Sequence, residues 1–126
     1  MKIQEFVIEP RYKKENGLYI LDINSIKIPF EVKDISVVNI PPKQFGGNHK
    51  HPRQEAFVGI GEELELIWMD GNKRMTKKMN PEGKNILFVI PSDLGHAVVN
   101  NSNSQFGILL EYASDSQKDV QICQML

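Results

Sequence analysis

The sequence predicts an all-β domain, built as an antiparallel sandwich or barrel. About ten short apolar or alternating segments are separated by turn signals, roughly every eight to twelve residues, which is typical of such folds. No segment has the apolar period of a convincing amphipathic helix. The chain of 126 residues, 40% hydrophobic and 25% charged, matches the size and composition of one globular domain, residues 1–126.

The charge and the cysteine content exclude several classes of partner. The formal net charge is −1, so no basic field attracts nucleic acid or an acidic membrane surface. The N-terminal residues carry an early acid, Glu5, and no apolar run, unlike a signal peptide, and no segment is long enough to span a membrane. The single cysteine, Cys123, excludes an internal disulfide and suits a reducing cytoplasm. We therefore expect a cytoplasmic protein with a small-molecule partner.

The first third of the chain is predicted to form short, interrupted strands. These are expected over residues 2–8, 18–22, 25–28 and 33–40. Pro10 ends the first one, which marks it as an edge strand. Basic residues around Lys13 precede the Asn16-Gly17 turn, and are expected in a solvated loop or, alternatively, at a phosphate contact beside the barrel mouth. The dense apolar pattern of 33–40 predicts a strand covered on both faces.

The rest of the chain alternates strands with clear turn signals. Strands are expected over residues 55–60, 64–69, 72–79, 86–90, 96–100 and 105–112. Asp70-Gly71 is the strongest hairpin signal in the chain, while residues 43–48 are predicted to be a loop. Two structures remain open for residues 114–126, which contain either a short helix over 117–123 or an edge strand over 120–123.

All three histidines lie in two polar stretches, together with one glutamate. His49, His51 and Glu55 are separated by even offsets, so an extended strand places them on one face, and His96 joins them from a second strand. Three imidazoles and a carboxylate can hold a divalent transition metal, namely Zn, Fe(II), Mn, Ni or Cu, and ligand type alone does not choose among these ions. Alternatively, the four groups form a hydrogen-bonded cluster that binds substrate without metal.

Three further residues are predicted to bind substrate. Arg53 shares the parity of the histidines, and is either a substrate anchor or an exposed arginine beside the barrel mouth. An anchoring role predicts that replacing Arg53 leaves the metal in place and weakens an anionic substrate. Asn100 lies on the His96 face and either positions a ligand or stabilises a turn. Tyr112 is a candidate proton donor by inward alternation.

Two motifs resemble those of the cupin family. The first is His, one residue, His, three residues, Glu, at His49, His51 and Glu55; the second is Pro, four residues, His, three residues, Asn, at 91–100. The resemblance, with core motifs over about 43–113, implies a jelly-roll β-barrel in which His49, His51, Glu55 and His96 hold one metal. Asp93 stands where the family usually has glycine, and aspartate tolerates the left-handed backbone of such a turn.

A narrower resemblance concerns the sugar-nucleotide cupins. It is carried by residues 28–33, 47–51, 70–71, 89–91 and 109–114. These segments are similar to ketoisomerases of thymidine-diphosphate-linked 4-keto-6-deoxy sugars and to the cupin domain of capsule-synthesis reductases. The resemblance implies proton transfer beside a keto group, with His49 and His51 as acid and base, and a homodimer. Asn16 departs from the arginine expected to meet the nucleotide phosphate, and Glu55 restores a metal-type motif.

Three functions follow from these patterns. The favoured one is a metal-binding cupin that acts as an isomerase or epimerase of a nucleotide-linked keto-sugar in polysaccharide biosynthesis. A second is a metal-dependent oxygenase of a small molecule, which would use open positions on Fe(II). The third is a non-catalytic cupin that binds a sugar or another small molecule.

Overall fold

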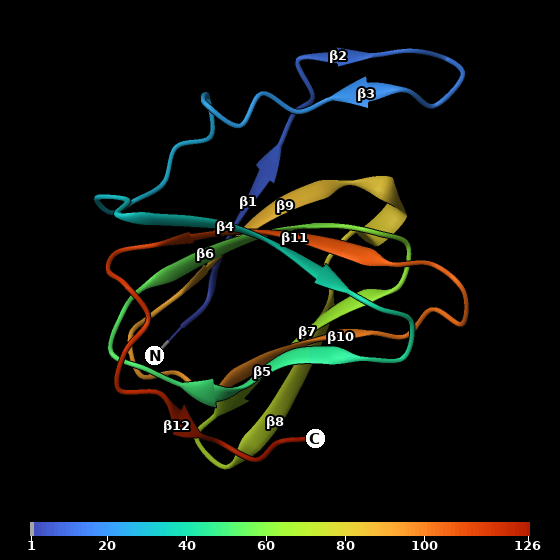
Figure 1. Ribbon diagram of the computed structural model, residues 1–126. Coiled ribbons are helices and arrows are strands. Elements are labelled where there is room, and N and C mark those ends of the chain that lie inside the picture. Colours follow the sequence, from blue (N-terminus) through green and yellow to red (C-terminus); the bar gives the residue numbers. More distant parts are fainter. Residues whose placement is uncertain (1) are drawn as a thin grey trace.

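Two five-stranded antiparallel sheets pack face to face (Figure 1). The computed structural model of the chain describes residues 2–126. The first sheet has the order β1 (Gln4–Ile8), β9 (Asn85–Ile90), β6 (Glu55–Ile60), β11 (Gly107–Ala113) and β4 (Asp34–Ile40). The second has the order β12 (Gln121–Ile122), β5 (Phe45–Lys50), β10 (His96–Asn100), β7 (Leu64–Asp70) and β8 (Lys73–Lys78). A separate hairpin pairs β2 (Tyr12–Lys13) with β3 (Tyr19–Ile20).

This architecture confirms the predicted all-β antiparallel fold, in its two-sheet jelly-roll form. Within residues 2–126 the only helical element is a 3-10 turn, Pro81–Gly83. In the same part of the chain no helix is long and apolar enough to cross a membrane.

The main core fills the space between the two sheets. Its residues include Phe57, Leu66, Phe88 and Leu109, all buried. A second apolar cluster lies on the other face of the first sheet, where residues 21–32 cover Val58, Leu87 and Tyr112. Strand β9 is buried along its whole length, because alternate side chains enter the two clusters. The first sheet therefore has a covered outer face and an inner face that meets the second sheet.

Several local predictions are confirmed. Strand β1 lies at a sheet edge, and the β7–β8 hairpin pairs Asp70 with Lys73 around Gly71, whose φ is 63°. Asp93 has a φ of 62°, the left-handed turn expected of aspartate at this position. The C-terminal segment takes the strand alternative, because Gln121–Ile122 pairs with β5.

Other local predictions are wrong. Residues 43–48, predicted as a loop, contribute most of β5, whose glycines and asparagine hide its strand character. Strand β4 is not covered on both faces: Ile35 is 62% and Val37 61% exposed, because the strand lies at the sheet edge. Residues 25–28 form no strand, and residues 18–22 contribute only Tyr19–Ile20. These short segments gain their apolar contacts by lying across the first sheet rather than by joining it.

Candidate functional site

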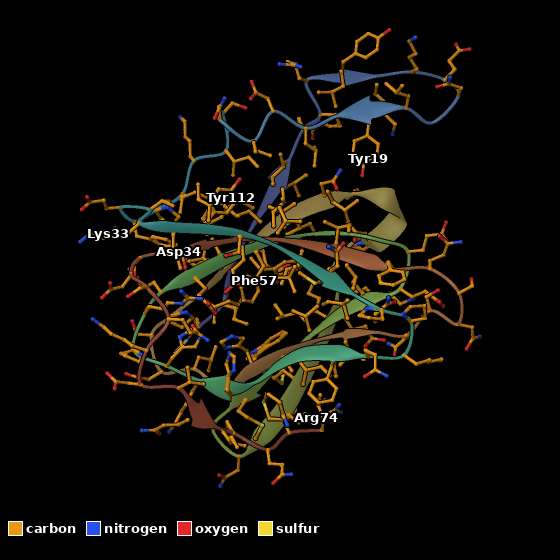
Figure 2. All side chains as sticks on the ribbon, in the orientation of Figure 1. Tyr19, Lys33, Asp34, Phe57, Arg74 and Tyr112 are labelled. Carbon is orange, nitrogen blue, oxygen red and sulfur yellow. The ribbon has the colours of Figure 1, made fainter. Side chains whose placement is uncertain are left out.

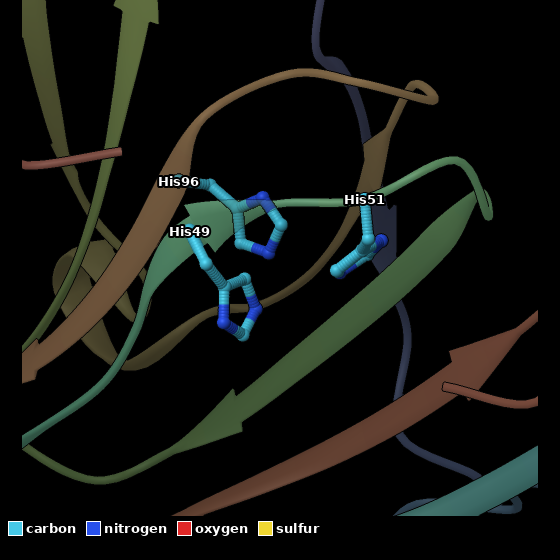
Figure 3. Close-up of side chains that lie close together, drawn as sticks. All are labelled: His49, His51 and His96. Atoms are coloured by element: carbon cyan, nitrogen blue, oxygen red, sulfur yellow. The ribbon is translucent and has the colours of Figure 1, made fainter. Parts of the chain in front are cut away.

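Three imidazole rings meet at one end of the space between the sheets. His49 lies on β5, His51 follows that strand, and His96 begins β10. The ring centroids are 5.1 Å apart for His49 and His51, and 5.3 Å apart for each pair with His96. One nitrogen from each ring lies within 4.8 Å of the other two. Figure 3 shows the three rings turned toward one shared space.

The backbone of β5 is shaped to bring its histidine against His96. His49 pairs with His96, and the β5–β10 register shifts directly after His96. Gly47 has a φ of +86°, and a Cβ there would lie 2.9 Å from the carbonyl oxygen of His96. Only glycine accepts both this backbone conformation and this approach, so Gly47 lets the two strands close on the site.

The hydrogen bond of His96 determines which of its nitrogens is available. Its Nδ1 lies 2.8 Å from the carbonyl oxygen of Leu94, which can only accept, so Nδ1 donates. A neutral His96 therefore carries its lone pair on Nε2, and that atom lies 3.0 Å from Oε1 of Glu55. A lone pair facing a carboxylate oxygen at this distance requires a proton on Nε2 or a cation nearby.

His51 meets the same carboxylate oxygen. Its Nε2 is also 3.0 Å from Oε1 of Glu55. Within the described residues, neither ring nitrogen of His51 nor this Oε1 has a partner aligned for a hydrogen bond, although all three atoms are buried. Buried polar atoms are rarely left without partners, so these atoms are available to a ligand. Imidazole and carboxylate donors together fit a divalent transition metal.

The surroundings of Glu55 favour its ionised form. Burial opposes its charge, but the contacts from His51 and His96 hold the pKa of Glu55 below its usual range. A negative Glu55 is the state that a cation or an imidazolium at the site needs.

Arg53 occupies the other oxygen of Glu55. Its Nε and Nη2 donate to Oε2 at 3.0 and 2.7 Å. Nη2 also donates to Glu111 at 2.9 Å, and Nη1 donates to Asp34 and to the carbonyl oxygen of Asp115, both at 3.1 Å. All five N–H groups of the guanidinium are thereby engaged. Arg53 is only 8% exposed, so the alternative of an exposed arginine is wrong.

Glu111 is a site residue that the sequence interpretation missed. It lies on β11 beside Arg53, and burial together with the neighbouring Glu55 raises the pKa of Glu111 to about 8. The sequence did contain a sign of this position. Glu111 is two residues after Leu109 on an alternating strand, so it shares the face of Leu109, which meets the inner core. Asp34, the third acid at Arg53, was missed because it stands at the start of a distant strand.

A cavity of about 160 Å³ opens beside the imidazoles. Its polar lining comprises His49, Arg53, Glu55, His96, Glu111 and Gln117. His51 is not among the described residues that line it. Burial, with the neighbouring His96 and His51, lowers the pKa of His49, which favours its neutral form. A larger cavity of about 530 Å³ lies beside β1 and residues 25–29, and its lining contains none of these groups.

Two predicted substrate-binding residues lie away from this cavity. The Asn100 side chain donates to the carbonyl oxygens of Ile40 and Gln105 at 2.9 and 2.8 Å, which matches its turn-stabilising alternative. Tyr112 belongs to the outer cluster, on the face of the first sheet opposite the histidines. In Figure 2, Tyr112 lies outside the first sheet, whereas Phe57 points between the sheets.

The comparisons with known proteins identify the fold. No protein-family model and no curated protein sequence matches the chain. The sugar 3,4-ketoisomerase QdtA from Thermoanaerobacterium thermosaccharolyticum, solved with TDP, aligns with a TM-score of 0.72 at 13% identity, over 93% of this chain and 83% of QdtA. The TDP-quinovose 3,4-ketoisomerase WlaRB from Campylobacter jejuni aligns with a TM-score of 0.69 at 18% identity, over 95% of this chain and 92% of WlaRB.

A third similar structure is the capsular polysaccharide assembling protein CapF from Staphylococcus aureus. It aligns with a TM-score of 0.64 at 18% identity, over 79% of this chain but 29% of CapF. These likenesses confirm the cupin-type jelly roll that the two sequence motifs predict.

Proposed function

We propose that this protein is an isomerase or epimerase of a nucleotide-linked keto-sugar in polysaccharide biosynthesis. The observation that carries the proposal is the convergence of His49, His96 and Glu55 on one cavity between the sheets. QdtA is a sugar 3,4-ketoisomerase that was solved with TDP, and WlaRB is a TDP-quinovose 3,4-ketoisomerase. A mutant of QdtA was also solved with TDP-4-keto-6-deoxyglucose, which supports a substrate of this class.

The reaction requires a base beside a carbonyl group. A keto group acidifies the neighbouring C–H, so a base removes that proton and leaves an enediol after the keto oxygen is protonated. Loss of the other hydroxyl proton, with protonation of the former carbonyl carbon, moves the keto group by one carbon. His49 lines the cavity, and its lowered pKa favours the neutral ring that can accept a proton. His51 does not line this cavity within the described residues, so of the expected acid and base pair we assign His49 to meet the substrate.

The cavity admits only the reacting end of such a substrate. Its volume of about 160 Å³ is below the roughly 300–1,000 Å³ that is usual for a small-molecule site. We infer that the sugar ring enters the space beside His49 and that the nucleotide lies outside it.

We further propose that His49, His51, Glu55 and His96 hold one divalent transition metal. The buried, unaligned nitrogens of His51 and the lone pair of His96 facing Glu55 support this assignment. A bound cation would supply positive charge that stabilises an enolate oxygen. A neutral imidazole whose second nitrogen is protonated has one lone pair, so His49 serves either as a ligand or as the base, and the metal content of the purified protein decides between these roles.

A ligand screen tests the function. TDP-4-keto-6-deoxyglucose is expected to raise the melting temperature, because a ligand at 100 times its Kd stabilises the native state by about 2.7 kcal/mol. In D2O, NMR is expected to show deuterium entering the carbons beside the keto group. TDP-glucose, which has no keto group, serves as the control and should exchange no carbon-bound hydrogen. A protein that neither binds the keto-sugar nor catalyses this exchange contradicts the proposal.

We also propose that the protein is a homodimer. The β2–β3 hairpin projects from the two sheets (Figure 1) and exposes Tyr12, Leu18 and Ile20. A two-stranded hairpin alone is marginally stable in water, so it needs cover from another surface. Strand β4 offers exposed Ile35 and Val37 at a sheet edge for such a contact. Light scattering at micromolar concentration should give twice the chain mass, and a monomeric mass contradicts this prediction.

A further inference from the structure

Arg53 joins three strands of the first sheet and the segment that follows one of them. Its guanidinium contacts Asp34 on β4, Glu55 on β6, Glu111 on β11 and the carbonyl oxygen of Asp115, which follows β11. No N–H of the guanidinium is left over for a substrate. This arrangement gives Arg53 a role toward Glu55 rather than toward the contents of the cavity.

The two oxygens of the Glu55 carboxylate have different partners. Both Nε and Nη2 of Arg53 lie on Oε2, at 3.0 and 2.7 Å. The other oxygen, Oε1, lies 3.0 Å from Nε2 of His51 and 3.0 Å from Nε2 of His96. Two N–H groups of one rigid guanidinium converge on Oε2 and fix its position, and the single ammonium of a lysine does not reproduce this pair of donors.

The charges around Arg53 make this contact necessary. One guanidinium faces three carboxyl groups, those of Asp34, Glu55 and Glu111. Without the guanidinium, Asp34 and Glu55 would lose a shared positive partner, and Glu55 would lose the donors that fix its orientation.

We propose that Arg53 is a positioning residue, which holds Glu55 so that Oε1 stays between Nε2 of His51 and Nε2 of His96. It acts through Glu55, because its N–H groups are already engaged by protein oxygens. The test by metal affinity rests on the proposed metal site of the proposed function. The test by the imidazole nitrogens uses metal-free protein and does not depend on that site.

Metal affinity provides the first test. Arg53→Lys keeps the positive charge among the three acids and removes the fork, so the variant is expected to fold and to bind Zn(II) about 10–100-fold more weakly. A competing chelator measures the affinity, and near-ultraviolet circular dichroism checks the fold. Arg11→Lys is the matched control. Arg11 is exposed, and its ion pair with Asp22 is long, at 3.8 Å, so this variant should bind Zn(II) as the wild type does. Wild-type Zn(II) affinity in folded Arg53→Lys overturns the proposal.

The imidazole nitrogens provide the second test, in metal-free protein at one fixed pH. In Arg53→Lys, the Nε2 chemical shifts of His51 and His96 should change, because both atoms face Oε1. The nitrogen chemical shifts of His49 should stay unchanged, since the described ion pairs include none between His49 and Glu55. This difference separates positioning from general loosening, which would move all three rings. Equal changes in all rings, or none, overturn the proposal.

The outcomes also separate this inference from the proposed function. If wild-type protein takes up no metal, the metal assignment fails and the ring shifts alone decide the role of Arg53. If Arg53→Lys keeps full Zn(II) affinity and unchanged rings but loses affinity for TDP, Arg53 is a substrate anchor and the positioning role is wrong.

Discussion

Replacing His96 by alanine should remove most of the bound metal while leaving the jelly roll folded. His96 supplies the one lone pair whose direction is set by a hydrogen bond, from Nδ1 to the carbonyl oxygen of Leu94. Losing a direct ligand should cost more than the roughly 10–100-fold that follows from losing an outer partner. Elemental analysis of purified wild-type and variant protein measures the change. The fold should persist because Phe57, Leu66 and Phe88 supply the core.

The control for this experiment is Glu62→Ala, which removes an exposed acid. It should keep the wild-type metal content. His51→Ala should resemble His96→Ala, because both rings face Oε1 of Glu55. Wild-type protein that purifies without metal, and takes up no Zn, Ni, Mn or Fe(II), rules out the metal assignment, and leaves His49 free to act as the base of a metal-free isomerase.

The largest loss of stability is expected for Glu55→Gln. Glu55 is 1% exposed, and it is the partner of Arg53, His51 and His96. The substitution keeps the shape of the side chain but leaves the buried guanidinium with a neutral amide. Breaking a buried ion pair by removing one partner costs about 3–5 kcal/mol, so the free energy of unfolding should fall by this amount. Urea unfolding, followed by circular dichroism, measures it in metal-free protein.

Glu62→Gln is the matched control for this loss. Its side chain is exposed, so the free energy of unfolding should stay within about 0.5 kcal/mol of the wild type. A Glu55→Gln protein as stable as this control would show that the surrounding acids, Glu111 and Asp34, take over the guanidinium.

Local patterns in the sequence predict the fold class and the chemical character of the site. Alternating apolar segments and turn signals such as Asp70-Gly71 predict antiparallel strands, because side-chain alternation and hairpin turns are local properties of the chain. The three histidines and Glu55 were recognisable from their motif, and the structure brings the three rings together beside this carboxylate. The argument that even offsets on one extended strand place His49, His51 and Glu55 on one face was only partly right. His49 lies on β5 and Glu55 begins β6, so no single strand carries both.

How these groups face one another depends on contacts between segments that are distant in the sequence. Asp34, Glu111 and Arg53 meet because β4, β6 and β11 lie side by side, a pairing between segments far apart in sequence. Tyr112 falls on the covered outer face because residues 21–32 pack there, although its alternation alone is compatible with either face. Local patterns report which side chains share a face of a strand. Which face meets the second sheet, and which charges share a buried space, depends on long-range packing that no local pattern records.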